Sequence, residues 1–84
     1  LIEGSTPIED MKHALEIDSM PDEENYETLA GFMMFKLRKI PRPADTVIHA
    51  GYKFEVVDVD HFKIDQLLVT RIIEINPLIQ EESE

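Results

Sequence analysis

Hydrophobic and polar positions along the chain follow one period in the first half and another in the second. Ile8, Met11 and Leu15 recur at spacings of three and four, and a second apolar run covers residues 29–40. This is the period of a helix with one apolar face. From residue 46 onward, apolar and polar side chains alternate, which is typical of half-buried strands. The pattern therefore predicts two helices followed by a set of strands.

The first helix is expected to begin in the segment Thr-Pro-Ile-Glu. Thr6 is a good capping residue, Pro7 suits the first helical position, and Glu9 completes a Thr-x-x-Glu capping box. We expect the helix to end near Ile17, before Asp-Ser-Met-Pro. Residues 1–4 are expected to form a short strand that a glycine ends.

The second helix is expected to begin at Pro21 and the acidic residues after it, because negative charge is favourable near a helix N-terminus. Its expected end lies at Ile-Pro-Arg-Pro, since both prolines lack an N–H group. We expect Leu29 and Phe32 to be buried. The helix interior also holds Gly31, which costs about 0.5–1 kcal/mol relative to alanine. We therefore expect its side of the helix to approach the sheet closely.

The second half of the chain predicts antiparallel strands. Residues 46–49 and 52–59 read as a hairpin around Ala50-Gly51, and the alternation breaks at Val57, which indicates a bulge. Asp-His-Phe-Lys is the next expected turn, and residues 64–75 are the last expected strand. We expect a single domain over residues 1–76, followed by an acidic tail over residues 77–84.

Charge and composition exclude several classes of function. The chain of 84 residues has 18 acidic and 8 basic residues and a net charge of −10, which disfavours binding to nucleic acid or general adsorption to anionic lipid. It has no cysteine, so no disulfide can form. No apolar run approaches the roughly 20 residues that span a bilayer. The chain begins at Leu1, and we expect it to be a fragment of a longer protein.

Half of all the basic residues lie within one short segment: Lys36, Arg38, Lys39 and Arg42. The first three suit the C-terminal end of a helix, where the helix dipole favours positive charge. Arg42 follows Pro41 and lies outside the predicted helix. Two interpretations stay open: a solvated helix end, or an interaction patch that docks onto an acidic surface of the parent protein or of a second subunit.

Candidate catalytic and metal-binding residues do not form a motif. The three histidines, His13, His49 and His61, lack the spacing of a metal site. Asp58 and Asp60 are expected to face the same way and could bind a divalent cation or act in acid–base chemistry, but a solvated strand end explains them more simply. We therefore expect no catalytic residues, no metal ligands and no enzymatic activity.

Several segments in a fixed order carry a resemblance to a known family. They are Tyr-Glu-Thr-Leu-Ala-Gly at residues 26–31, Ile-Pro at residues 40–41 and Gly-x-x-Phe-Glu-Val at residues 51–56. With their surroundings they resemble the transporter-associated domain of the CorC/HlyC family over about residues 1–73. Two positions depart from the family's usual pattern. Arg38 stands where a glycine is common, and His61-Phe62 replaces a turn that usually contains glycine.

The resemblance implies an α+β fold with two helices packed on one face of a mainly antiparallel sheet, similar to part of FAD-binding oxidoreductases. It implies a non-catalytic regulatory or interaction module at the cytoplasmic C-terminus of an inner-membrane protein. The implied partners are CBS and transmembrane domains of that protein, with a homo-oligomer left open. Family members are linked to magnesium and cobalt efflux or are called hemolysin-like. The alternative is a binding module for FAD or an adenine nucleotide, whose ligand residues are unknown; otherwise no cofactor is expected.

Overall fold

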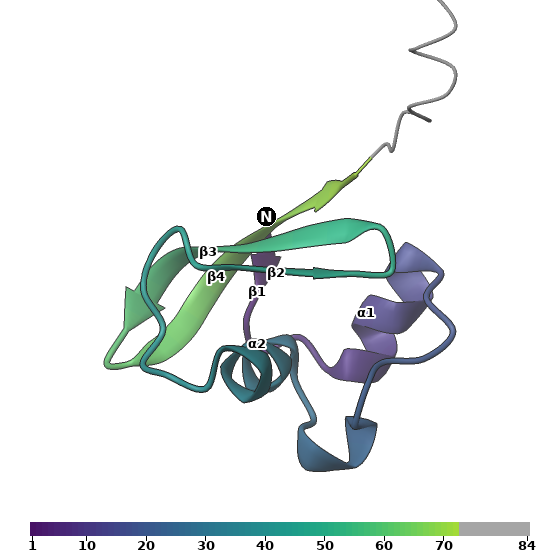
Figure 1. Cartoon of the computed structure of the whole chain (residues 1–84), viewed down its shortest axis with the longest axis horizontal. Helices are drawn as coiled ribbons and strands as arrows, with labels where there is room; N and C mark the ends of the chain where they lie inside the picture. The colour runs from purple at the N-terminus through teal and green to yellow at the C-terminus, as the bar shows by residue number, and fades with distance from the viewer. Residues whose placement is uncertain (73–84) are drawn as a thin grey trace, which may run out of the picture.

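The computed structural model describes residues 1–72 and shows two helices on one face of a four-stranded sheet (Figure 1). In chain order the elements are β1 (Ile2–Glu3), α1 (Ile8–Leu15), the 3₁₀ helix η1 (Glu23–Asn25), α2 (Leu29–Leu37), β2 (Thr46–His49), β3 (Tyr52–Asp60) and β4 (Lys63–Arg71). The expected α+β class is confirmed. The expected strand end after residue 72, the boundary at residue 76 and the acidic tail over 77–84 lie outside the described residues.

The sheet is antiparallel throughout, with the strand order β1-β4-β3-β2. The two predicted hairpins turn at Ala50-Gly51 and His61-Phe62. The predicted N-terminal strand is present and pairs with β4. The register between β3 and β4 shifts between Val56 and Asp58, which confirms the predicted bulge.

Both hairpin turns hold their two central residues in the left-handed region. The φ angles are 54° and 82° at Ala50 and Gly51, and 52° and 66° at His61 and Phe62. Two-residue turns of this kind suit right-twisted strands and favour Asn-Gly. Arg38, which ends α2, also has a positive φ of 54°. The positions at which this chain departs from the family's usual glycines are therefore positions where other residues are strained.

Replacing both His61 with Asn and Phe62 with Gly should stabilise the domain. The change relieves left-handed strain at two residues, and Phe62 loses little packing because its side chain is 69% exposed. We expect the free energy of unfolding to rise by about 1–2 kcal/mol, measured by urea denaturation. Lys63→Gly is the matched control, because it places glycine at a strand residue and should destabilise instead. A double variant less stable than the parent would contradict this prediction.

The first helix starts differently from the prediction. Thr6 does not cap it: α1 begins at Ile8, with Pro7 at the capping position and no side-chain cap. The N–H of Ile8 instead donates to the carbonyl of Glu27 (2.9 Å), and the N–H of Leu29 donates to the carbonyl of Thr6 (2.9 Å). The segment before each helix thus supplies a carbonyl acceptor for the first N–H group of the other helix. This N–H of α1 therefore needs no side-chain cap.

The second helix begins at Leu29, not at Pro21, and Thr28 caps it by accepting a hydrogen bond from the N–H of Gly31 (3.1 Å). The acids at residues 22–24 lie in and before η1, outside the first turn of α2. The prediction that Gly31 faces the sheet is also wrong. A Cβ at this position would lie 3.1 Å from the Cβ of Tyr26 and 3.4 Å from the Oγ1 of Thr28, both in the segment before the helix.

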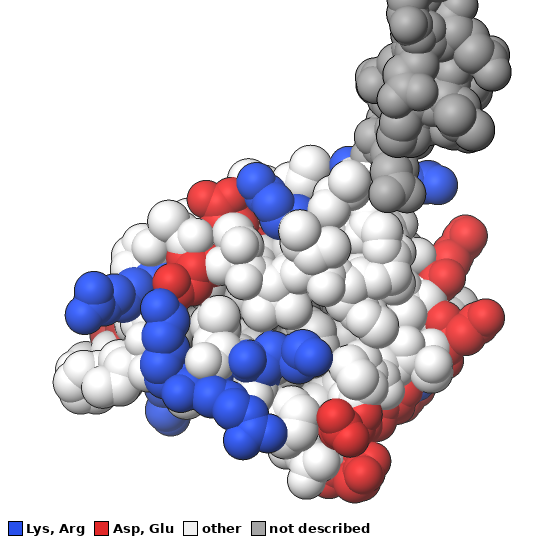
Figure 2. Space-filling view, in the orientation of Figure 1, with Lys and Arg blue, Asp and Glu red and all other residues white. Residues whose placement is uncertain are grey.

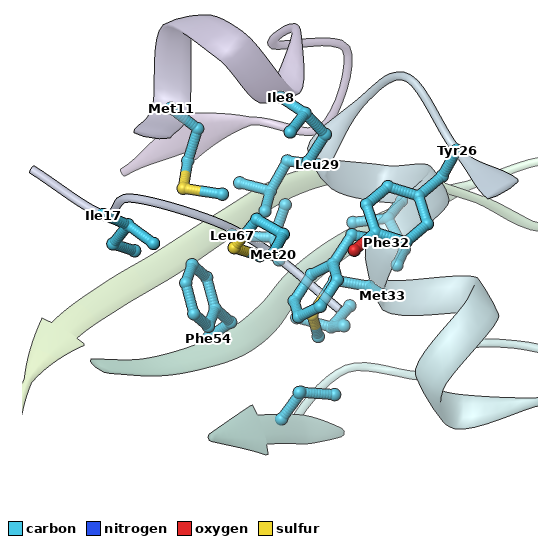
Figure 3. Packing of buried hydrophobic residues seen from close by; sticks show 13 residues of the cluster. Ile8, Met11, Ile17, Met20, Tyr26, Leu29, Phe32, Met33, Phe54 and Leu67 are labelled. Atoms are coloured by element: carbon cyan, nitrogen blue, oxygen red, sulfur yellow. The ribbon is translucent and has the colours of Figure 1, made fainter. Parts of the chain in front are cut away.

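The core lies between the helices and the sheet (Figure 3). Leu29 and Phe32 are fully buried, as predicted. The buried face of α2 is narrower than the sequence suggested. Met34 is 41% exposed, and Ile40, which lies beyond the end of the helix, is 63% exposed. The buried residues come from every layer: Ile8, Met11, Ile17, Met20, Tyr26, Leu29, Phe32, Met33, Val47, Phe54, Val56, Ile64 and Leu67.

Candidate interaction surface

The basic patch is formed by Lys36, Arg38, Lys39 and Arg42, all of which are exposed. Figure 2 shows Lys and Arg side chains gathered at the lower left of the molecule, over α2 and the segment that follows it. Only Lys36 lies inside the last turn of α2; Arg38 is the capping residue, and the other two lie in the loop to β2. The helix dipole therefore accounts for less of this cluster than the sequence suggested.

Asp45 holds the loop of the basic patch in place. Its Oδ2 accepts a hydrogen bond from the N–H of Arg42 (2.9 Å), and its Oδ1 lies 3.1 Å from the Nζ of Lys39. The loop is also bonded to β3, because Ala44 donates to the carbonyl of Val56 (2.8 Å) and Val56 donates to the carbonyl of Asp45 (2.9 Å). The loop that carries Lys39 and Arg42 is thus held against the sheet.

The electrostatics of the loop leave a net positive surface. The N–H of Arg42 and then the ammonium of Lys39 lower the pKa of Asp45, so this carboxylate stays ionised and offsets Lys39. Asp45 was not predicted from the sequence, although an acidic residue three positions after Arg42 in a proline-rich turn is a recognisable signal for such a contact. Lys36, Arg38 and Arg42 form no ion pair within residues 1–72.

Arg38 is fixed against an aromatic ring. Its backbone N–H donates to the carbonyl of Met34 (2.9 Å), and its guanidinium carbon lies 5.2 Å from the centre of the Phe35 ring. This is the range of a cation–π contact, which holds a guanidinium flat while leaving its edge free for hydrogen bonds. Ile40, 63% exposed, lies between Lys39 and Pro41 in the same segment. Fixed positive charge beside an exposed apolar side chain suits docking with an acidic partner.

An ion pair on the other side of the molecule joins α1 to η1. The Nζ of Lys12 lies 2.9 Å from Oε1 of Glu23. The Oε2 of Glu23 accepts a hydrogen bond from the N–H of Met20 (2.6 Å). The Met20 N–H and then Lys12 lower the pKa of Glu23, and Glu23 raises the pKa of Lys12. This pair anchors the irregular segment 16–25 against the first helix.

Acid should weaken the domain through Glu23 and Asp45. Because the folded-state pKa of each is lowered, each adds stability above the ordinary carboxyl pKa and loses it as the pH falls through the lowered value. We expect the midpoint temperature of thermal unfolding to decrease as the pH is lowered below about 4. Glu23→Gln should lower the midpoint at pH 7 and flatten this acid dependence, with Glu9→Gln, an exposed neighbour, as control. Equal acid profiles for Glu23→Gln and the parent would refute the role of Glu23.

The histidines and paired acids lie apart. His13 is exposed on α1, His49 ends β2, and His61 lies 2.8 Å from Asp60 in the β3–β4 turn. Asp58 and Asp60 both face solvent, as expected, while Val59 packs against the core. Within residues 1–72 no three His, Asp or Glu side chains come together in a way that could hold a metal ion.

Two open hollows flank the segment after α1. One, of about 480 Å³, lies between residues 15–19, the β2–β3 turn and the end of β4. The other, of about 510 Å³, lies along the exposed side of α1. Both are lined by Glu16 and Asp18, and the first also by Arg71. Carboxylates at these positions disfavour the diphosphate of FAD or ATP.

Fold and surface together define a small α+β accessory domain with a preorganised basic patch. The chain matches the family described as transporter associated domain, CorC_HlyC, over residues 1–72, and it belongs to this family. It is 64% identical over 72 residues to a polyamine export protein of Escherichia coli K12, covering 86% of this chain and 16% of that protein. The corresponding protein of Salmonella typhimurium is 60% identical over 72 residues, with the same coverage. The chain thus spans about a sixth of the length of these relatives.

Solved structures support the same assignment. A CorC_HlyC domain from Haemophilus ducreyi is 51% identical, with a TM-score of 0.80 and coverage of 87% of both chains. A CorC_HlyC domain of a Xylella fastidiosa hemolysin, solved in complex with Mg²⁺ and Mn²⁺, is 35% identical, with a TM-score of 0.76 and coverage of 86% of this chain and 85% of that one. No helix in residues 1–72 is long and apolar enough to cross a membrane.

Proposed function

We propose that this domain is a non-catalytic regulatory and interaction module of a membrane exporter of small cations. The observation that carries the proposal is the 64% identity to a polyamine export protein, in which the matching segment is only 16% of the length. We therefore assign polyamines as the cargo of the parent protein, in place of the magnesium or cobalt that the family resemblance first implied. The domain itself lies on the cytoplasmic side of the inner membrane, beside CBS and transmembrane domains of the parent.

The basic patch is the proposed docking surface of this module. It presents Lys36 and Arg38 at the end of α2, and Arg42 on the loop that Asp45 and β3 hold in place. On a chain of net charge −10, a local positive surface directs the domain toward an acidic face of the parent protein or of a second subunit. Docking through this surface couples the state of the domain to the transport pathway. A site for FAD or an adenine nucleotide is less favoured, because Glu16 and Asp18 line both hollows.

Charge reversal of the basic patch should impair export without unfolding the domain. The double variant Arg38→Glu and Arg42→Glu in the parent protein places repulsion at the proposed interface, so cells should retain more putrescine or spermidine than cells with the parent protein. Lys53→Glu combined with Lys63→Glu, two lysines on β3 and β4 outside the patch, is the charge-matched control. Thermal unfolding of the isolated variant separates docking from folding. Unchanged polyamine levels in cells expressing the double variant at parent abundance would overturn the proposed role of the patch.

A further inference from the structure

β2 is an outer strand of the sheet, and its register shows which backbone groups point outward. The N–H of Val56 donates to the carbonyl of Asp45, so this pair is of the hydrogen-bonded type. Hydrogen-bonded and non-hydrogen-bonded pairs alternate along an antiparallel ladder. Val47 and His49 therefore bond β3, whereas the N–H and C=O groups of Thr46 and Ile48 point away from it. Within residues 1–72 these outward groups have no backbone partner.

The β2 edge lacks the features that usually prevent strand pairing. Natural edge strands carry lysine, proline or a bulge. The four residues of β2, Thr-Val-Ile-His, have none of these, their pairing with β3 is regular, and Ile48 is 66% exposed. A bulge lies just before the strand, where Ala44, with a φ of 79°, and Asp45 together oppose Val56. β1, at the opposite edge, is only two residues long and is followed at once by Gly4. β2 is therefore the edge strand that is available for pairing with another strand.

We propose that β2 pairs antiparallel with β2 of a second copy of this chain, so that two four-stranded sheets join into one. The outward groups of Thr46 and Ile48 fix the register. The two Val47 residues lie opposite each other at the two-fold axis. On each side of the axis, Thr46 of one copy lies opposite Ile48 of the other. Two hydrogen-bonded pairs then close the edge on both sides of the axis.

Side chains at the ends of this pairing are complementary. The same register places Asp45 of each copy opposite His49 of the other, a carboxylate against an imidazole, and places no two like charges opposite each other. A second copy supplies this match at both ends, in addition to the bonds that Asp45 makes to Arg42 and Lys39 in its own copy. A four-residue edge buries little area compared with the roughly 1,200 Å² of a stable interface, so we expect a dissociation constant of about 0.1–1 mM.

Salt distinguishes this contact from docking through the basic patch. Each copy has a net charge of −10, so long-range repulsion opposes the dimer and salt screens it. Strand pairing should strengthen as salt rises to about 0.5 M, whereas docking of the basic patch onto an acidic surface should weaken. The dimer does not depend on the proposed transport role, and either can fail alone.

Cross-linking tests the register directly, because the chain has no native cysteine. Mixing Thr46→Cys with Ile48→Cys protein under oxidising conditions should give mainly the mixed disulfide, since hydrogen-bonded partners lie about 5.5 Å apart between Cα atoms, within disulfide range. Lys53→Cys, on the neighbouring strand, is the control and should cross-link poorly with either. Mixed and homodimeric products at their statistical ratio would overturn the proposed register.

Sedimentation velocity tests the association itself. The parent chain should dimerise as its concentration rises toward the millimolar range, more so in high salt. Ile48→Pro removes an outward N–H but no β2–β3 bond, so it should stay folded and monomeric; Ile48→Thr, which keeps the N–H, should still dimerise. Thermal unfolding confirms that each variant folds. A parent chain that is monomeric at about 1 mM in high salt would overturn the proposal.

Discussion

Phe32→Ala should lower the free energy of unfolding by about 3–5 kcal/mol, the usual range for a buried phenylalanine. The side chain is fully buried in the middle of the core, as Figure 3 shows. Its ring packs edge-on against two others, with centroids 5.4 Å from Tyr26 and 5.6 Å from Phe54. The substitution thus removes contacts that join α2 both to the segment before it and to β3.

The matched control is Met34→Ala on the same helix. Met34 is 41% exposed, so its truncation should change stability by well under about 1 kcal/mol. Urea denaturation followed by circular dichroism gives both values. Because a small domain has a total stability of only about 5 kcal/mol or somewhat more, the Phe32 variant can be unfolded even without denaturant. A parent-like midpoint for Phe32→Ala, or equal losses for the two variants, would contradict the central place of this ring.

Local patterns in the sequence predicted much of the fold. The two hairpins follow from alternation around short turns, and the break in alternation at Val57 marked the bulge between β3 and β4. The short N-terminal strand was also predicted, although its pairing with β4 depends on residues far along the chain. The arrangement of the layers came from the family resemblance, which the comparisons confirm.

The helix starts could not be predicted because distant residues determine them. Thr6 has the pattern of a capping box, but Glu27 supplies the acceptor for the N–H of Ile8. Tyr26 and Thr28 are extended beside this contact, and α2 begins only at Leu29. Helix propensity and capping patterns depend on neighbours within about one helical turn, so they cannot predict a hydrogen bond between residues 8 and 27.

The candidate site was predicted in composition but not in geometry. The cluster of Lys36, Arg38, Lys39 and Arg42 is plain in the sequence. Two of the three members that were expected in the last turns of the helix, Arg38 and Lys39, lie beyond Leu37, where α2 ends. The anchoring by Asp45 depends on the loop folding back onto β3, which no local pattern encodes. Arg38 in the left-handed conformation likewise shows a strained position that alternation and helical period do not reveal.

Gly4, rather than Gly31, is the glycine at which two elements approach closely. Its N–H donates to the carbonyl of Asp65 (2.8 Å) and its carbonyl accepts the N–H of Ala30 (2.8 Å), so it joins β4 to α2. A Cβ at this position would collide with the carbonyl oxygen of Ile64 and lie 3.1 Å from the Cβ of Ala30. The collision partner is backbone in the sheet, which cannot turn aside as a flexible side chain does.

Gly4→Ala should therefore cost about 3 kcal/mol, the upper end of the range for an added group in a filled space. Gly51→Ala is the matched control, because nothing lies within 4 Å of its added Cβ and only its positive φ of 82° opposes the change. That strain should cost about 1 kcal/mol. Urea denaturation of both variants isolates the collision as the difference between them. If Gly4→Ala loses no more stability than Gly51→Ala, the junction of β1, β4 and α2 is looser than its hydrogen bonds indicate.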